Sequence, residues 1–233
     1  DKYGYDHGVN DGGNALMASA YLARWDGAVL EENDPYPNSL ADVKYKEINP
    51  DYHVQNIIYL PYRNGDLDNN EIKNAVMKYG AVYTALKINY DYFDKTQTNY
   101  CLPKNVNKYN GGHAINIVGW DDNYSRMNFV SPPEKDGAFI CKNSWGTGSG
   151  ENGYFYVSYY DKYIARALCG DFNAVFYDVE SNENYNKVYQ YDYLGPVVSY
   201  NMGSKKVYAA NVFPENGKVL EESEKLKAVS FYN

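Results

Sequence analysis

One histidine and one asparagine are the residues of this sequence best placed to do chemistry. His113 follows two glycines and opens an apolar run, residues 114–120, and Asn143 begins the segment Asn-Ser-Trp-Gly. Imidazole titrates near neutral pH, so it can both take and give a proton. The glycines let a second backbone or a substrate approach closely. Either residue alone would be typical of a structural position, so the prediction of a site depends on the two together.

The pair and its flanking residues closely resemble the papain family of cysteine peptidases. In that family a Gly-His-Ala strand and an Asn-Ser-Trp-Gly strand end place a base beside its orienting amide. Here Gly112-His113-Ala114 supplies the first segment, and residues 143–146 lead into a Gly-Tyr-Phe strand at 153–155. The resemblance covers residues 1–172, and the second segment is its most specific part.

The resemblance implies thiolate acyl transfer as the reaction. A cysteine thiolate would attack the scissile carbonyl, with His113 as the acid and base. Asn143 would hold the imidazole through its amide oxygen, the role that a carboxylate plays in serine triads. Trp145 would shield the His–Asn bond from water and form a wall on the leaving-group side.

Substrate-binding positions follow from the same resemblance. Gly12 and Gly13 match a glycine pair whose backbone hydrogen-bonds an extended peptide. Ala85 and Ala114 match the lining of the pocket for the second residue before the cut, and two alanines predict a roomy apolar pocket. Asn14 and Ala15 are weaker candidates for that lining. The helix after the glycine pair and the segments 25–29, 34–36 and 80–82 match in order.

The expected nucleophile is absent from these residues. The family places its cysteine roughly 130–150 residues before the histidine, a position that falls before Asp1. Cys101 is too close to His113, Cys141 lies on the strand leading to Asn143, and Cys169 follows both. We therefore expect the chain alone to be inactive, lacking both the cysteine and the glutamine of the oxyanion hole. Ser149 stands where the family commonly has a second tryptophan, which predicts a looser loop beneath the site.

The residue pattern predicts an α+β architecture with few helices. One helix is expected from Asn14 to about Trp25. A second is expected after Asp68, which forms a capping box with Glu71, and it ends at Gly80. The buried face of the second helix is predicted to consist of Ile72, Ala75, Val76 and Tyr79. Strands are expected at 81–88, 114–120, 137–142 and 154–160, after the helices rather than between them.

Two domains are predicted, a papain-like peptidase domain over residues 1–172 and a partial β domain over residues 173–233. The first would lack part of its N-terminal helical half. The second resembles the start of a lectin-like domain that follows the peptidase in some exported bacterial members. Short strands are expected there at 174–179, 187–193, 207–213 and 228–232. Extra strands packed on the peptidase are the alternative, and sugar binding does not follow from fold.

The composition of the chain limits the classes of partner and cofactor that it is expected to bind. A net charge of −8 at pH 7 would repel nucleic acid. His7, His53 and His113 show no ligand spacing, and three cysteines without a CxxC pair form neither a zinc site nor a disulfide framework, so no metal or cofactor is predicted. No apolar run approaches the roughly 20 residues of a membrane span. The 28 tyrosines suit half-exposed strands, and suit sugar or peptide binding as well.

The function predicted for the parent protein is that of a secreted or cell-surface bacterial cysteine endopeptidase acting on peptides or proteins. Its C-terminal β domain would offer a second partner class, cell-wall or surface glycan. Two alternatives remain. One is a pseudopeptidase whose Gly12–Gly13 groove holds a peptide without cutting it, and the other is an adhesion protein whose function lies in the β domain.

Overall fold

The computed structural model describes residues 11–36, 39, 49–185, 187–190, 203, 225 and 227. The chain divides into two compact units, one of residues 1–53 with 180–233, the other of residues 54–179. The strands predicted at 207–213 and 228–232 lie outside the described residues. So does the end of the strand predicted at 187–193, and its described part, 187–190, is not a strand.

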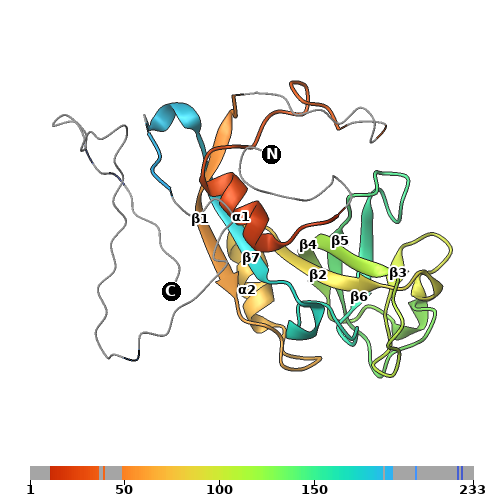
Figure 1. The fold of residues 1–233 in the computed structure, drawn as a ribbon. Coiled ribbons are helices and arrows are strands. Elements are labelled where there is room, and N and C mark those ends of the chain that lie inside the picture. The colour runs from red at the N-terminus through yellow and green to blue at the C-terminus, as the bar shows by residue number, and fades with distance from the viewer. Residues whose placement is uncertain are drawn as a thin grey trace. The chain divides into compact units, whose positions relative to one another are not determined.

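A seven-stranded sheet with the order β1-β7-β2-β4-β5-β6-β3 organises residues 52–181. Its strands are β1 Tyr52–Leu60, β2 Val82–Ile88, β3 Asn99–Tyr100, β4 Gly111–Asp121, β5 Ala138–Lys142, β6 Tyr154–Ser158 and β7 Asn173–Ser181. β2, β4, β5 and β6 pair antiparallel, and β3 joins β6 in parallel (Figure 1). The α+β prediction is therefore confirmed, with a mixed sheet.

The predicted strands at 81–88, 137–142, 154–160 and 174–179 are confirmed within one or two residues. β4 is the exception, because it begins at Gly111 rather than at Ala114. Gly111 and Gly112 pair with Ile88 and Lys87 of β2, so His113 lies inside a ladder instead of opening one. Glycine weakens the sequence signal of a strand without preventing backbone pairing.

Two strands have no counterpart in the sequence prediction. β1 shows little of the strict alternation that marks a half-buried strand, since most of its residues are only partly buried. β3 is two residues long, too short for any periodicity. The last strand, β7, pairs with β2 at Tyr83 and Ala174, so it belongs to the same sheet. The domain division after residue 172 stays a prediction.

Helix α2, Asn70–Tyr79, has the predicted apolar face: Ile72, Ala75 and Val76 are buried. It ends at Gly80, whose φ of 91° is a conformation that glycine adopts without strain. The predicted capping box is wrong. Asn69 is the N-cap residue, and the Asp68 carboxylate accepts the backbone N–H of Asn64 (2.9 Å), which closes the preceding turn instead of the helix.

Helix α1, Ala15–Ala23, belongs to the other compact unit and confirms the first predicted helix. The Asn14 side chain accepts the backbone N–H of Met17 (3.0 Å), which satisfies one of the donors left free at a helix start. None of the helices in the described ranges is long and apolar enough to cross a membrane.

The core of the larger unit forms where α2 meets the sheet. Ile72 packs in one cluster with residues from β2, β4, β5 and β6, including Leu86, Ile117, Phe139 and Phe155. All four of these strand side chains are fully buried.

A buried carboxylate organises the segment that follows β6. Asp161 accepts the backbone N–H groups of Leu102, Tyr163 and Ile164 at 2.8, 2.9 and 2.8 Å. Burial raises its pKa, and these bonds act in the opposite direction. This one side chain thereby links the chain after β3 to the chain after β6. It also pairs three backbone N–H groups that would be costly to leave unpaired in the interior.

The packing of α2 gives a stability prediction. Ile72 is 1% exposed and Met77, five residues on in the same helix, is 77% exposed. Ile72→Ala should lower the free energy of unfolding by about 2–5 kcal/mol, because it leaves a cavity. Met77→Ala should change it by less than about 0.5 kcal/mol. Urea unfolding followed by circular dichroism measures both, and equal effects would show that this face does not form the core.

Candidate active site

His113 lies near the start of β4, on the face of the sheet that the core covers. It stands directly opposite Leu86 of β2, and Ile115 and Ile117 continue the same face of β4. Leu86, Ile115 and Ile117 are at most 3% exposed, while His113 is only half-buried. The histidine therefore lies at the boundary between the buried face of the sheet and the solvent.

Asn143 reaches the same face from β5. Asn116 pairs with Lys142, so the next residue, Asn143, continues the register opposite Ile115. Residues two apart on one strand share a face, so His113 is the diagonal neighbour of Asn143 on that face. The backbone N–H of Asn143 donates to the carbonyl of Gly153 (2.9 Å), which fixes the residue beyond the end of the strand.

The two side chains are hydrogen-bonded, with 2.8 Å between His113 Nε2 and Asn143 Oδ1. The same oxygen accepts the backbone N–H of Ser144 (2.8 Å), and a backbone N–H can only donate. Oδ1 is thus identified as an acceptor, and Nε2 must carry the proton that it shares. In the neutral imidazole this leaves Nδ1 as the free base.

Trp145 covers this pair. Its ring stacks on the His113 ring with centroids 4.6 Å apart and an interplanar angle of 29°. The Phe93 ring also contacts the indole, with 5.7 Å between the ring centroids and an interplanar angle of 56°. The amide nitrogen of Asn143 is buried and bonds to none of the described residues. The histidine, the asparagine and the tryptophan predicted from the sequence are brought together as one cluster.

Burial lowers the pKa of His113 below its ordinary value, and the hydrogen bond to Asn143 opposes this shift. A neutral imidazole is the form that accepts a proton, so the ring is held ready as a base. Since Trp145 stacks directly on the ring, it contributes to the desolvation that causes the shift.

Ala85 and Ala114 stand directly opposite each other on β2 and β4. Adjacent residues of a strand point to opposite faces, so these alanines lie on the face away from His113. Ala85 is 8% exposed and Ala114 is exposed. The structure brings the two together, and their role as a pocket lining stays a prediction.

Gly12 and Gly13 belong to the other compact unit and directly precede the start of α1. Both are exposed, and Gly12 has a φ of 79°, a left-handed conformation that suits glycine. A Cβ on Gly12 would meet nothing within 4 Å. Their backbone is thus accessible from solvent, and their role in holding a peptide stays a prediction.

None of the three cysteines is suited to act as a nucleophile. Cys101, Cys141 and Cys169 are 3%, 0% and 6% exposed, and all are free thiols. Burial raises the pKa of each thiol, that of Cys169 to about 12. A thiolate is the reactive species, so these groups are inert at neutral pH.

The loop after Trp145 is held by several hydrogen bonds, and the looser loop expected from Ser149 stays a prediction. The Ser149 hydroxyl donates to Gln97 Oε1 (2.9 Å), and its carbonyl accepts the N–H of Gly153 (2.9 Å). Gly150 donates its N–H to the Thr96 carbonyl (3.0 Å). A side chain on Gly150 would collide with the Tyr154 carbonyl, so glycine is required there.

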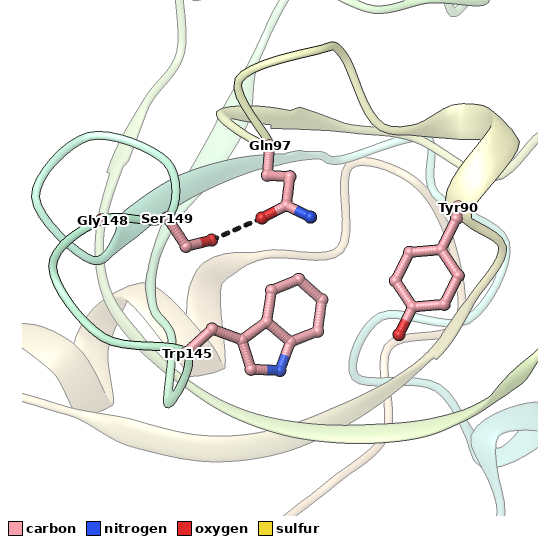
Figure 2. Close-up of a pocket in the computed structure, with 5 residues that line it drawn as sticks. All are labelled: Tyr90, Gln97, Trp145, Gly148 and Ser149. Atoms are coloured by element: carbon pink, nitrogen blue, oxygen red, sulfur yellow. Dashed lines mark hydrogen bonds between the residues drawn. The ribbon is translucent and has the colours of Figure 1, made fainter.

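A hollow of about 380 Å³ opens beside Trp145, lined by Tyr90, Gln97, Trp145, Gly148 and Ser149. Figure 2 shows the indole at its centre, with Gln97 and Tyr90 on the facing loop. Sequence reasoning missed Tyr90 and Gln97. They belong to no motif, and Gln97 lies in a loop with a φ of 57°, so no periodicity marks it.

Across the described residues, no group of three or more His, Cys, Asp or Glu side chains is placed to hold a metal ion. The described side chains of the site offer an imidazole, an amide hydrogen-bonded to it and a stacked indole.

Comparison with known proteins identifies the family of this chain. The family described as papain family cysteine protease matches residues 3–179, and a lectin like domain matches residues 188–233. A cysteine protease of Blomia tropicalis is 27% identical over 164 residues, 67% of this chain and 44% of that protein.

Two solved structures of the clostridial cysteine protease Cwp84 are also similar. The form after propeptide cleavage is 33% identical with a TM-score of 0.71, covering 84% of this chain and 48% of that one. The structure of the cysteine protease and lectin-like domains of Cwp84, a surface layer associated protein of Clostridium difficile, is 34% identical with a TM-score of 0.63. It covers 76% of this chain and 38% of that one. The chain spans less than half the length of each of these relatives.

The burial of His113 predicts its titration. In NMR spectra of this chain, the His113 ring signals should titrate below the ordinary histidine value of about 6.5. Trp145→Ala should raise the pKa, because it exposes the ring to water. Asn143→Ala should lower the pKa, because it removes the bond that favours the protonated form. Titration of the unsubstituted chain at or above the ordinary value would contradict the inferred burial.

Proposed function

Because the chain belongs to the papain family of cysteine proteases, we propose that it supplies the acid–base part of an endopeptidase that cuts peptide bonds by thiolate acyl transfer. The family resemblance seen in the sequence, with a lectin-like region after the peptidase, is confirmed by the matches. The observation that carries the proposal is the bond from His113 Nε2–H to Asn143 Oδ1, which leaves Nδ1 for a thiol.

The proposed reaction begins with proton transfer from a cysteine thiol to His113 Nδ1. The resulting thiolate attacks the carbonyl carbon of the scissile bond and forms a C–S bond. As the C–N bond breaks, the proton on Nδ1 passes to the leaving nitrogen. Water then attacks the thioester, His113 takes its proton, and that proton returns to the departing sulfur. Asn143 accepts from Nε2 throughout and stabilises the imidazolium.

The thiol in this proposal comes from a segment of a longer protein that precedes residue 1. The support for this is chemical: all three cysteines of the chain are buried and have raised pKa values. An ion pair with a thiolate favours the charged imidazole, so the longer protein would shift the pKa of His113 upward from its value in this chain.

The substrate would pass the start of β4, which carries His113, and the end of β5, which leads to Asn143. Trp145 stacks on the base that protonates the leaving amine, so the residues after the cut would pass beside the indole. Gly12 and Gly13, with accessible backbone, would hydrogen-bond the residues before the cut. Ala85 and Ala114 would leave space for an apolar side chain before the cut, since each projects only a methyl group from its face of the sheet.

The longer protein is proposed to act at a bacterial cell surface, with surface glycan as a second partner. The support is the match of residues 188–233 to a lectin like domain and the similarity to Cwp84, a surface layer associated protein. A glycan array probed with the longer protein should give binding that is lost when the whole lectin-like domain is removed. If no glycan on the array binds, glycan is not a partner, and the peptidase proposal is unaffected.

The peptidase proposal predicts the effects of two substitutions in the longer protein. His113→Ala should lower kcat on a fluorogenic peptide by about 10²–10⁴-fold, because it removes the general acid and base. Asn143→Ala should lower kcat by a smaller factor, since the base remains but loses its orientation. Met127→Ala, at an exposed side chain outside the site, is the control and should leave kcat unchanged.

The same assay separates the rival functions. The chain of residues 1–233 alone should show no turnover, and a thiol alkylator should abolish turnover by the longer protein. Turnover by the isolated chain that an alkylator blocks would overturn the assignment of the nucleophile. A longer protein that binds peptides without cutting them would instead be a pseudopeptidase.

A further inference from the structure

The hollow beside Trp145 is lined by polar side chains that the proposed reaction does not use. Gln97 reaches it from the loop that precedes β3, and Tyr90 from the segment after β2. The Tyr90 and Trp145 rings are 6.3 Å apart (Figure 2). His113 stacks on the same indole that lines the hollow, so under the proposed reaction the hollow would lie on the leaving-group side.

The Gln97 side chain is fixed in one orientation. Its Oε1 accepts the Ser149 hydroxyl (2.9 Å), so its amide NH₂ is left to donate. Figure 2 shows this nitrogen on the side of the amide that faces Tyr90. Ser149 is itself only 9% exposed, so the bond is shielded from competing water.

The loop that carries Gln97 is equally constrained. The Gln97 N–H donates to the Asp94 carbonyl (3.0 Å), and Asp94 Oδ1 accepts the N–H of Thr98 (2.7 Å). Asn99 donates its side-chain amide to Asp94 Oδ2 (2.7 Å). A donor held by such a network loses little conformational entropy when it binds a partner.

The free polar groups around the hollow are hydrogen-bond donors. They are the Gln97 NH₂, the Trp145 indole N–H and the Tyr90 hydroxyl, which can also accept. Within the described ranges, none of these three groups bonds to another residue. The matching ligand group is therefore an acceptor, a carbonyl oxygen or a carboxylate.

The charges next to the hollow decide between these two acceptors. The segments that line it carry Asp91, Asp94 and Glu151 against one cation, Lys95. A bound carboxylate would meet net like charge, whereas a carboxamide would not. The arrangement therefore favours an uncharged carbonyl.

We propose that this hollow selects substrates with glutamine or asparagine on the leaving-group side of the cut, with Gln97 as the specificity-determining residue. Ser149 is its positioning residue, because it acts only through Gln97. In an extended peptide successive side chains point to opposite sides, so one of the first two residues after the cut faces the hollow. This inference rests on the proposed peptidase function for its place in catalysis.

The kinetic test uses the longer protein and fluorogenic peptides that differ at one position. The first and then the second residue after the cut is varied among Gln, Met and Glu, where Met has the shape of Gln without its polar atoms. At one of the two positions, kcat/KM should be about 3–10-fold higher for Gln than for Met, the size expected of one neutral hydrogen bond. Glu should be the poorest of the three.

Three variants attribute the preference to named atoms. Gln97→Leu should abolish the preference for Gln over Met, because it removes the amide donor that would pair with the substrate carboxamide. Ser149→Ala should reduce the preference and Ser149→Thr, which keeps the hydroxyl, should retain it. A merely structural role for Ser149 would lower kcat/KM for all peptides by the same factor.

A binding measurement on the chain of residues 1–233 keeps the inference testable without activity. Dipeptide amides Ala-Gln-NH₂ and Gln-Ala-NH₂, each paired with its Met counterpart, are titrated in NMR spectra. A Gln peptide should shift the Gln97 side-chain NH₂ and Trp145 indole signals at lower concentration than its Met counterpart, and the difference should vanish in Gln97→Leu.

The outcomes separate the two proposals. No turnover of any peptide by the longer protein, with Gln-selective binding intact, would end the peptidase proposal and leave the hollow as a carboxamide-binding site. Turnover with equal kcat/KM for Gln and Met at both positions would overturn the specificity inference and leave the peptidase standing. Loss of turnover for every peptide to the same extent in Gln97→Leu would also overturn it.

Discussion

The register of β4 against β5 is the constraint on which the rest of the site depends. Asn116 pairs with Lys142, and this one pairing puts Asn143 on the face of His113. A slip by a single residue would turn every side chain of one strand to the other face. The register changes between Ile117 and Gly119, where β4 has a bulge on the far side of the site. Ile115 and Ile117 before the bulge and Trp120 after it all pack in or against the core, while the site end keeps its pairing.

Burial at the edge of the core has two effects that work together. It orders His113 against Trp145 and Asn143, and it lowers the pKa of the imidazole, which favours the neutral form that can accept a proton. The folded chain holds this histidine neutral to lower pH than the unfolded chain does. The contribution of His113 to stability is therefore fully present above about pH 6.5, the ordinary pKa of histidine. It is lost as the pH falls from there through the lowered pKa of the folded state. The same desolvation strengthens the hydrogen bond to Asn143, since competing water is kept away.

The fold was largely predictable where residues repeat with a clear period. The apolar face of α2 follows from the helical period, and β2, β5 and β6 were predicted from short runs rich in residues that favour strands. The cap of α2 was not predictable, because Asp68 and Asn69 are equally good N-cap residues and the competing turn at Asn64 decides between them. β1 and β3 were missed because pairing partners far along the chain, rather than local pattern, make them strands.

The residue types of the site could be read from the sequence: an imidazole, an amide and an indole in segments specific enough to show the family. They stand out because no packing requirement would select these residue types. Only the tertiary structure decided which imidazole nitrogen is free, since that depends on the Ser144 N–H fixing the Asn143 amide. Only the tertiary structure brought Gln97, Ser149 and Trp145 to one hollow, because loops distant in sequence meet through backbone bonds that leave no periodic trace.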